Sequence, residues 1–334
     1  MTTASVNDRI QLIVTGASNE KTCSPSLAQG PWEFDTSAPS YGPGASMGDV
    51  IPTGSPVQGG LPEEYKVASN EELRARIRAA KETLGDKLVI LGHFYQRDEI
   101  VQHADYLGDS FQLARAAADR TDADYIVFCG VHFMAETADI LSQPHQQVIL
   151  PNLAAGCSMA DMADIESVTQ CWEELTALYG SEADESGKVP IIPVTYMNSS
   201  ADIKAFTGRN GGTICTSSNA RAVLEWAFAK TKRVLFFPDQ HLGRNTARTM
   251  GVGLDEMCVW NPHDPALGGN AAEQVKKSRV ILWQGHCSVH AMFKPEHVDA
   301  MRANLPGVKV LVHPECSMEV VDKADLVGST SYIL

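Results

Sequence analysis

The chain has 334 residues, of which 44% are hydrophobic and 20% charged, and this composition is typical of folded globular proteins and excludes disordered or fibrous ones. It carries 27 basic against 41 acidic residues, and the net charge of −14 argues against nucleic acid as a partner. No apolar stretch approaches the roughly 18 residues of a membrane span, and no signal peptide is visible. We therefore expect a cytoplasmic protein of two or three domains with no membrane partner.

Eight cysteines are present, and none of them forms a CxxC pair. A zinc ribbon or zinc finger therefore has no support. In the cytoplasm we expect these cysteines to be thiols or metal ligands and not disulfides.

The first 62 residues are predicted to form a flexible extension. Between Thr22 and Leu61 about half of the residues are Gly, Pro or Ser, and the charged ones are Glu33, Asp35 and Asp49. Such a segment cannot bury enough apolar surface to order itself. The first helix is predicted over residues 71–84, behind a capping box that begins at Ser69.

Short β-rich runs then alternate with helical stretches along the rest of the chain. Runs that are apolar throughout predict parallel sheets covered by helices on both faces, so the fold class is α/β. Strands are predicted at 88–91, 125–128, 148–150, 191–195, 213–215, 234–237, 280–283, 309–312 and 325–327. Helices are predicted at 111–119, 134–141, 160–178, 219–229, 296–304 and 317–323.

A hydroxyl-rich turn recurs at near-equal intervals. It reads Gly108-Asp109-Ser110, Thr216-Ser217-Ser218 and Gly328-Ser329-Thr330, with spacings of 107 and 113 residues between Ser110, Ser217 and Thr330. Near-equal periods of this kind indicate duplicated units. We predict three similar α/β units over residues 63–156, 157–286 and 287–334, the third of them incomplete.

Polar side chains gather where the β-rich runs end. In parallel α/β units ligands collect at the carboxyl ends of strands, so these residues predict a shared cleft where three sets of loops converge. Ordinary solvation of strand ends explains the same pattern equally well. The residues are His93, Tyr95, Tyr196, Asn198, Cys287, His290, His313 and Glu315.

The three hydroxyl-rich turns each precede a helical stretch. Hydroxyls and free amides at a helix start bind carboxylate or phosphate oxygens, although the same residues also serve as ordinary N-caps. Their repetition at equivalent places favours a ligand with several anionic groups.

Two cysteines, Cys157 and Cys287, follow β-rich runs in loops. Thiolates presented in this way suit an iron-sulfur cluster or another soft metal site, while a lone loop cysteine is also often a small buried hydrophobe. Cys129, Cys171 and Cys215 are interpreted as packing residues.

The segment from His313 to Glu315 holds an imidazole and a carboxylate on a rigid Pro-containing turn, an arrangement suited to general acid-base chemistry. A turn with a solvated His and Glu is the alternative. The segment from Asp239 to Arg244 is interpreted as structural.

From about Lys87 to the end, the chain resembles the quinolinate synthases of NAD biosynthesis. The resemblance is specific because many motifs occur in order. They are Gly92-His93-Phe94-Tyr95, Gly108-Asp109-Ser110, Gly130-Val131-His132-Phe133-Met134-Ala135-Glu136-Thr137, Cys157-Ser158, Tyr196-Met197-Asn198-Ser199-Ser200-Ala201, Thr216-Ser217-Ser218, Pro238-Asp239-Gln240-His241-Leu242-Gly243, Trp283-Gln284-Gly285-His286-Cys287, His313-Pro314-Glu315 and Gly328-Ser329-Thr330-Ser331.

The resemblance implies three α/β/α sandwiches around a pseudo-threefold axis. It also implies an enzyme that condenses iminoaspartate with dihydroxyacetone phosphate to quinolinate, with loss of phosphate and water. In this family three cysteines, one from each unit, hold a 4Fe-4S cluster whose open iron acts as a Lewis acid. Cys157 and Cys287 match the first two.

The same resemblance implies the substrate-binding residues. They are His93, Ser110, Tyr196, Met197, Asn198, Ser217, His313, Pro314, Glu315 and Thr330, while Tyr95 and His290 match positions that line the same cleft. Glu315 is our candidate base, with Tyr95 and His290 as further catalytic candidates. The family also implies L-aspartate oxidase as an upstream enzyme and a homodimer.

The family's third cluster cysteine lies well past the Gly-Ser-Thr-Ser turn, and Cys316 does not match it. We therefore expect this chain to be a fragment of a longer protein. Two other classes stay open: a zinc or mononuclear-iron lyase or hydrolase that uses Cys157, Cys287 and a nearby His, and a catalytically silent anion-binding module.

Overall fold

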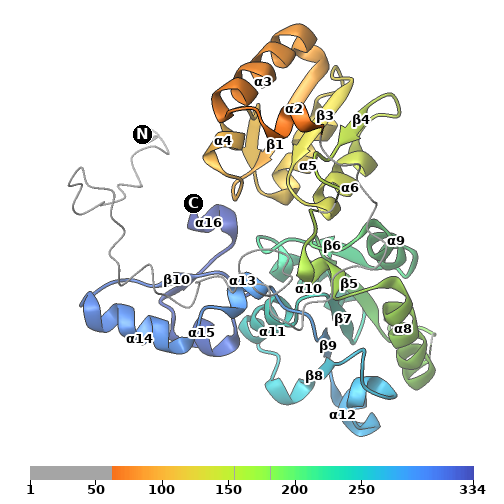
Figure 1. Ribbon diagram of the computed structural model, residues 1–334. Coiled ribbons are helices and arrows are strands. Elements are labelled where there is room, and N and C mark those ends of the chain that lie inside the picture. The colour runs from red at the N-terminus through yellow and green to blue at the C-terminus, as the bar shows by residue number, and fades with distance from the viewer. Residues whose placement is uncertain (1–61, 154, 181) are drawn as a thin grey trace, which may run out of the picture. The chain divides into compact units, whose positions relative to one another are not determined.

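The computed structural model describes residues 62–153, 155–180 and 182–334. Its strands form a four-stranded sheet of order β2-β1-β3-β4, a five-stranded sheet of order β6-β5-β7-β9-β8 and a two-stranded sheet β10-β11 (Figure 1). Every strand pairing in these residues is parallel, which confirms the predicted α/β class. Each sheet lies within one predicted unit, while the unit boundaries stay a prediction. The predicted extension lies outside the described residues except for Pro62.

The first sheet is built on apolar strands that pack against amphipathic helices. Helix α3 begins behind Ser69, whose Oγ accepts from the Glu72 amide at 3.2 Å, and ends at Gly85, whose φ of 53° suits glycine. The elements are α2 (Glu63–Lys66), α3 (Asn70–Leu84), η2 (Gly85–Lys87), β1 (Leu88–His93), α4 (Asp98–Val101), β2 (Tyr106–Gly108), α5 (Ser110–Asp119), β3 (Tyr125–Cys129), α6 (His132–Leu141) and β4 (Gln147–Ile149).

In the second sheet β5, β7 and β9 are buried along their whole length, as the apolar runs predicted. The elements around it are α7 (Ser158–Asp161), α8 (Ile165–Tyr179), β5 (Ile192–Tyr196), α9 (Ala201–Arg209), β6 (Thr213–Cys215), α10 (Ala220–Lys230), β7 (Val234–Phe237), α11 (Gln240–Thr249), η3 (Leu254–Glu256), β8 (Met257–Trp260), η4 (Leu267–Gly269), α12 (Ala272–Lys277) and β9 (Val280–Trp283).

The single helix predicted over residues 160–178 is wrong, because the structure has two helices there. Helix α7 ends at Asp161, and α8 starts behind Asp164, whose side chain accepts from the Ser167 amide at 2.8 Å. An aspartate that caps a new helix competes with continuation of the preceding one. The break leaves Cys157 on a short turn of its own.

The third sheet has two two-residue strands with a small core of Val298, Cys316 and Val320. Its elements are α13 (Ser288–Ala291), α14 (Pro295–Asn304), β10 (Leu311–Val312), α15 (Met318–Lys323), β11 (Leu326–Val327) and α16 (Thr330–Ile333). The three hydroxyl-rich turns stand directly before or at the start of α5, α10 and α16, as predicted.

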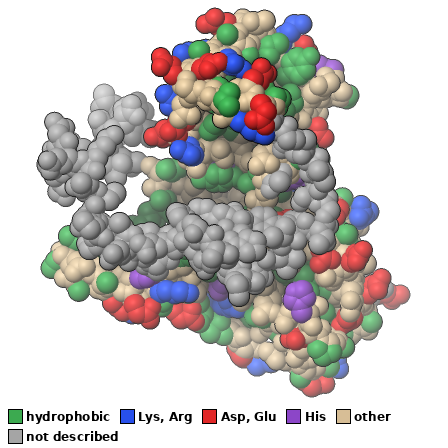
Figure 2. All heavy atoms as spheres, in the orientation of Figure 1, with side chains coloured by type: hydrophobic (Ala, Val, Ile, Leu, Met, Phe, Trp, Pro, Cys, Tyr) green, Lys and Arg blue, Asp and Glu red, His purple; other side chains and the backbone are tan. Residues whose placement is uncertain are grey.

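The surface of the described residues carries charges of both signs. Figure 2 shows Asp and Glu side chains interspersed with Lys and Arg over the visible face, in keeping with an acidic chain that still makes many surface ion pairs. Within residues 62–153, 155–180 and 182–334, no helix combines the length and the apolar character needed to cross a bilayer.

The centre of the second sheet should dominate the stability of this unit. Leu235 lies on β7 between β5 and β9 and is fully buried, so Leu235→Ala should lower the free energy of unfolding by about 3 kcal/mol through lost burial and a residual cavity. Leu254→Ala, at a half-exposed leucine of η3, is the matched control and should change it by less than about 0.5 kcal/mol. Chemical denaturation measures both, and equal losses would contradict this account of the core.

Candidate functional site

A cavity of about 560 Å³ is lined by loops that follow strands of all three sheets. This volume suits a small ligand with several functional groups. Thirteen of the fourteen sequence-predicted site residues line it: His93, Tyr95, Ser110, Cys157, Tyr196, Met197, Asn198, Ser217, Cys287, His290, His313, Glu315 and Thr330. Pro314 is buried behind the lining, and its carbonyl accepts a hydrogen bond from Asn245.

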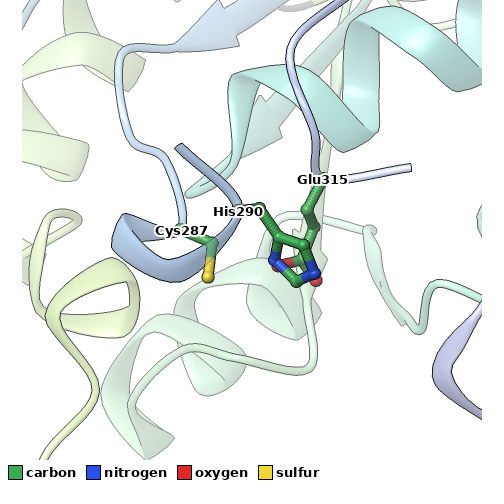
Figure 3. Close-up of side chains that lie close together, drawn as sticks. All are labelled: Cys287, His290 and Glu315. Carbon is green, nitrogen blue, oxygen red and sulfur yellow. The ribbon is translucent and has the colours of Figure 1, made fainter. Parts of the chain in front are cut away.

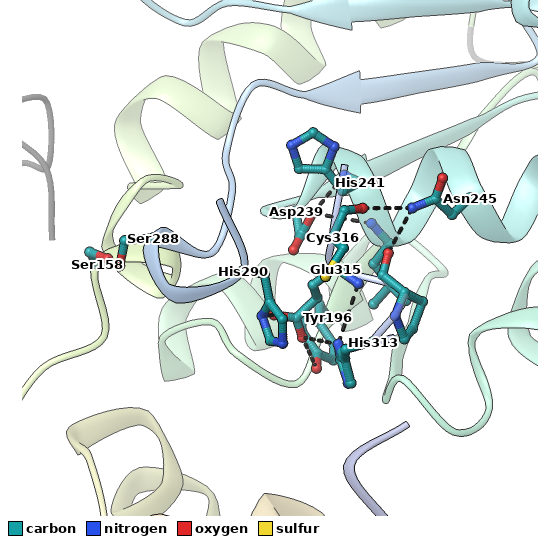
Figure 4. Close-up of polar contacts among 12 residues, drawn as sticks. Ser158, Tyr196, Asp239, His241, Asn245, Ser288, His290, His313, Glu315 and Cys316 are labelled. Carbon is teal, nitrogen blue, oxygen red and sulfur yellow. Dashed lines mark hydrogen bonds and ion pairs between the residues drawn. The ribbon is translucent and has the colours of Figure 1, made fainter. Parts of the chain in front are cut away.

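A buried carboxylate stands at the centre of the polar contacts. Glu315 is 4% exposed, and its Oε1 accepts from the Tyr196 hydroxyl at 2.5 Å. Its Oε2 lies 3.0 Å from Nδ1 of His290, whose ring stacks on that of His313 with centroids 4.6 Å apart (Figure 4). Tyr196 and His290, which are far apart in the chain, therefore hold the two oxygens of one carboxylate in a fixed orientation.

The charges in this cluster follow from burial and from neighbours. Burial alone would raise the pKa of Glu315, but His290, His313 and Tyr196 favour its ionised form and lower the pKa to about 2. Burial opposes protonation of His290, yet Glu315 and Cys287 raise its pKa to about 11. Burial and then Glu315 raise the pKa of Tyr196 well above its ordinary value. At neutral pH the cluster thus holds a carboxylate, an imidazolium and a phenol.

Two histidines occupy equivalent positions in the first and third units. Nδ1 of His93 accepts from the Tyr95 amide at 3.4 Å, and Nδ1 of His313 accepts from the Glu315 amide at 3.3 Å. Burial lowers the pKa of each to about 4, so both rings are neutral at pH 7. With Nδ1 accepting, the proton of each ring resides on Nε2. The cavity therefore has two neutral N–H donors on its walls.

The hydroxyl-rich turns bring donors from each unit to the cavity. Ser110 is the first residue of α5 and Thr330 the first of α16, while Ser217 precedes α10. The Ser331 hydroxyl donates to Asp109 Oδ2 at 2.8 Å, which joins the first turn to the third. The hydroxyls of Ser110 and Thr330 are thus held on neighbouring turns.

The two cavity cysteines lie on matching turns. Cys157 and Cys287 stand at the N-cap positions of the four-residue helices α7 and α13, and each is followed by a serine. The hydroxyls of those serines, Ser158 and Ser288, lie 3.2 Å apart. This contact ties the two thiol-bearing turns together across 130 residues of sequence.

Both thiols suit a soft metal group. Burial raises the pKa of Cys157 to about 12 and that of Cys287 to about 11, so without a metal each stays a protonated thiol. Among the described cysteines, no third one lines this cavity, and Cys316 packs in the small core of the third unit. The described residues therefore supply two thiolate ligands for a metal group, and both fit that role.

A second donor set overlaps the first. Sγ of Cys287, a ring nitrogen of His290 and a carboxylate oxygen of Glu315 all lie within 4.8 Å of one another. Figure 3 shows the His290 ring beside the Glu315 carboxylate, with the sulfur of Cys287 on the adjacent turn. A single metal ion is chemically compatible with these three donors.

Sequence reasoning missed the apolar wall of the cavity. Phe111, Val131, Phe133 and Met134 line it from the starts of α5 and α6. Val131, Phe133 and Met134 belong to a motif that carries the family resemblance, and Phe111 directly follows Ser110, but none of the four was predicted as a site residue. The wall gives the cavity a region of low polarity next to its hydroxyl donors.

Parallel α/β units whose strand-end loops line one cavity are typical of proteins that bind a small molecule there. Comparison with known proteins narrows this class. A family model described as quinolinate synthetase A protein matches residues 75–334. The quinolinate synthase of Corynebacterium glutamicum is 63% identical over 294 residues, which cover 88% of this chain and 73% of that protein.

Quinolinate synthases from a Nocardioides species and from Streptomyces coelicolor are 59% and 58% identical over 280 and 274 residues. Each alignment covers 82% of this chain, and they cover 69% and 68% of the relatives. The chain belongs to the quinolinate synthetase A family, which confirms the resemblance found in the sequence.

Proposed function

We propose that this chain is a quinolinate synthase of NAD biosynthesis, which condenses iminoaspartate with dihydroxyacetone phosphate and releases phosphate and water. The single observation that carries the proposal is the convergence on one cavity of thirteen residues assigned from sequence. Both substrates are small and anionic, and together they carry two carboxylates and one phosphate. The cavity offers hydroxyl donors from three turns to match them.

Hydroxyls and neutral imidazoles hold the anionic groups in this proposal. Ser110, Asn198, Ser217 and Thr330 donate to carboxylate and phosphate oxygens, and no lysine or arginine lines the described cavity. The Nε2–H groups of His93 and His313 add two donors. Donors fixed on helix starts and strand ends orient the two substrates for carbon-carbon bond formation without long, flexible cationic side chains.

Glu315 moves protons during isomerisation and dehydration. It is ionised at neutral pH, and Tyr196 and His290 fix both of its oxygens, so one oxygen can take a proton without reorientation. The positive charge of His290 and the hydroxyl of Tyr196 stabilise the carboxylate form of Glu315. Tyr95, whose ring centroid lies 3.9 Å from that of His93, orients the substrate from the cavity wall.

Cys157 and Cys287 are the proposed ligands of a 4Fe-4S cluster, and the family places a third cysteine beyond the matched motifs. When bound, such a cluster supplies an open iron that acts as a Lewis acid toward substrate oxygen and nitrogen. A homodimer, a cytoplasmic location and supply of iminoaspartate by L-aspartate oxidase stay predictions from the resemblance.

Product formation tests the proposal. The anaerobically reconstituted chain is incubated with freshly generated iminoaspartate and dihydroxyacetone phosphate, and quinolinate and inorganic phosphate are quantified. The proposal predicts one phosphate per quinolinate, with neither product formed when one substrate is omitted. An iron-loaded chain that releases phosphate without quinolinate, or forms neither, would refute it.

The overlapping donor set of Cys287, His290 and Glu315 favours a second candidate, a lyase or hydrolase with one zinc or iron ion. Metal analysis separates the two. The cluster predicts equal amounts of iron and acid-labile sulfide, whereas the alternative predicts about one metal ion per chain and no sulfide.

A further inference from the structure

Helix α11 contacts the turn that carries Glu315. The side chain of Asn245 is buried, and its Nδ2 donates to the carbonyl of Pro314 at 2.9 Å and to the carbonyl of Cys316 at 2.9 Å (Figure 4). These two carbonyls stand immediately before and after Glu315. The side-chain amide of Asn245 therefore donates both of its N–H groups to the backbone on either side of Glu315.

The helix that presents Asn245 is itself held firmly on the second sheet. Asp239, which is fully buried, caps it by accepting from the amides of His241 at 2.6 Å and Leu242 at 3.1 Å. Gly243 lies so close to the sheet that an added Cβ would come within 2.7 Å of both Phe236 and Leu282. The packing of α11 on β7 and β9 therefore fixes Asn245 relative to the second sheet.

The turn has little regular structure of its own to hold it. Strand β10 ends at Val312 and α15 begins at Met318. Within the turn between them, the Cys316 amide donates to the His313 carbonyl and the Glu315 amide donates to Nδ1 of His313. Loss of the Asn245 amide would leave the buried carbonyls of Pro314 and Cys316 without these donors. The turn would then lose stability or shift its backbone to find other donors.

We propose that Asn245 is a positioning residue for Glu315: it fixes the turn from His313 to Cys316 relative to the second sheet, so that the carboxylate meets Tyr196 and His290. Tyr196 lies at the end of β5, in the same sheet on which α11 packs. The inference rests on the proposed function only for the catalytic consequence, because the anchoring itself is a matter of structure.

The chain offers a matched control on the same helix. Arg248 of α11 also reaches the third unit, where its guanidinium pairs with both oxygens of Asp322 on α15 at 2.8 and 3.3 Å. This pair is exposed and does not touch the turn. Arg248→Ala removes a contact between α11 and α15 and leaves the hydrogen bonds of Asn245 to the turn in place.

Kinetics of quinolinate formation test the catalytic part. Asn245→Ala, and Asn245→Asp, which keeps the size of the side chain but not its two donors, should each lower kcat about 30-fold with KM for iminoaspartate changed less than about threefold. In the Glu315→Gln background, Asn245→Ala and Asn245→Asp should each lower kcat less than about twofold, because the carboxylate that Asn245 positions is absent. Arg248→Ala should stay within about twofold of the parent. Equal losses in both backgrounds would overturn the proposal.

Amide hydrogen exchange tests the anchoring without turnover. Peptides covering residues 311–318 should exchange at least about tenfold faster in Asn245→Ala than in the parent or in Arg248→Ala, while peptides from β5 and β7 stay unchanged. Unchanged exchange in 311–318 would overturn the proposal at any level of activity. If the parent forms no quinolinate but residues 311–318 still exchange faster in Asn245→Ala than in the parent, the anchoring is supported and the proposed function is contradicted.

Discussion

Glu315→Gln should lower the rate of quinolinate formation about a thousandfold at unchanged iron content, since a positioned general base contributes rate factors of this order. Glutamine keeps the size of the side chain and an oxygen for the Tyr196 hydroxyl, but it cannot accept a proton. It also removes the charge opposite His290. The measurement is the initial rate under anaerobic conditions, normalised to iron.

The control for this variant lies four residues further along the chain. Glu319 is exposed on α15 and does not line the cavity, so Glu319→Gln should retain more than about half of the parent rate. Thermal unfolding of both variants confirms that they are folded. Retention of full turnover by folded, iron-loaded Glu315→Gln would exclude Glu315 as the base.

Cys157→Ala and Cys287→Ala should each reduce bound iron after anaerobic reconstitution to below about a tenth of the parent value, because a cluster deprived of a thiolate is released. The parent should bind roughly four iron and four sulfide per chain when dithiothreitol is present as an external thiol. Iron, acid-labile sulfide and the thiolate-to-iron absorbance are measured together.

Cys129→Ala is the control for the cysteine variants. Cys129 is partly buried at the end of β3 and does not line the cavity, so its removal should leave the iron content within about a fifth of the parent. If Cys157→Ala or Cys287→Ala keeps its iron, the assignment of that cysteine as a cluster ligand is wrong.

The sequence predicted the central strands because burial on both faces leaves a continuous apolar run. Strands β1, β5, β7 and β9 all have this signature and were located to within two residues. The two strands that were missed, β2 and β8, lie at sheet edges. In β2, Tyr106 and Leu107 are exposed, so burial imposes no recognisable pattern on them.

Helix α11 was missed for a related reason. Its buried positions include Gly243 and Asn245. Gly243 packs closely against the sheet, and Asn245 donates hydrogen bonds to the turn around Glu315. Because neither residue is a large apolar one, the segment lacks the apolar periodicity that predicts a helix. The interpretation of Asp239 to Arg244 as structural agrees with the capping contacts of Asp239.

The sequence predicted which residues line the cavity but not which of them contact one another. Strand ends and repeated turns gave the cavity residues, because parallel topology brings such loops together. The pairing of Tyr196 with Glu315 spans 119 residues, and that of Ser158 with Ser288 spans 130. Contacts between residues so far apart in the sequence depend on how the units pack together, and local sequence patterns do not predict that packing.

A crystal structure of the anaerobically reconstituted chain with quinolinate tests the central claim most directly, namely that one cavity holds both the metal group and the anionic ligand. The account predicts iron density bound to Cys157 and Cys287 in the cavity. It also predicts that the two carboxylates of quinolinate lie within hydrogen-bond distance of hydroxyls from the Ser110, Ser217 and Thr330 turns. Iron bound away from these cysteines, or quinolinate bound outside the cavity, would contradict it.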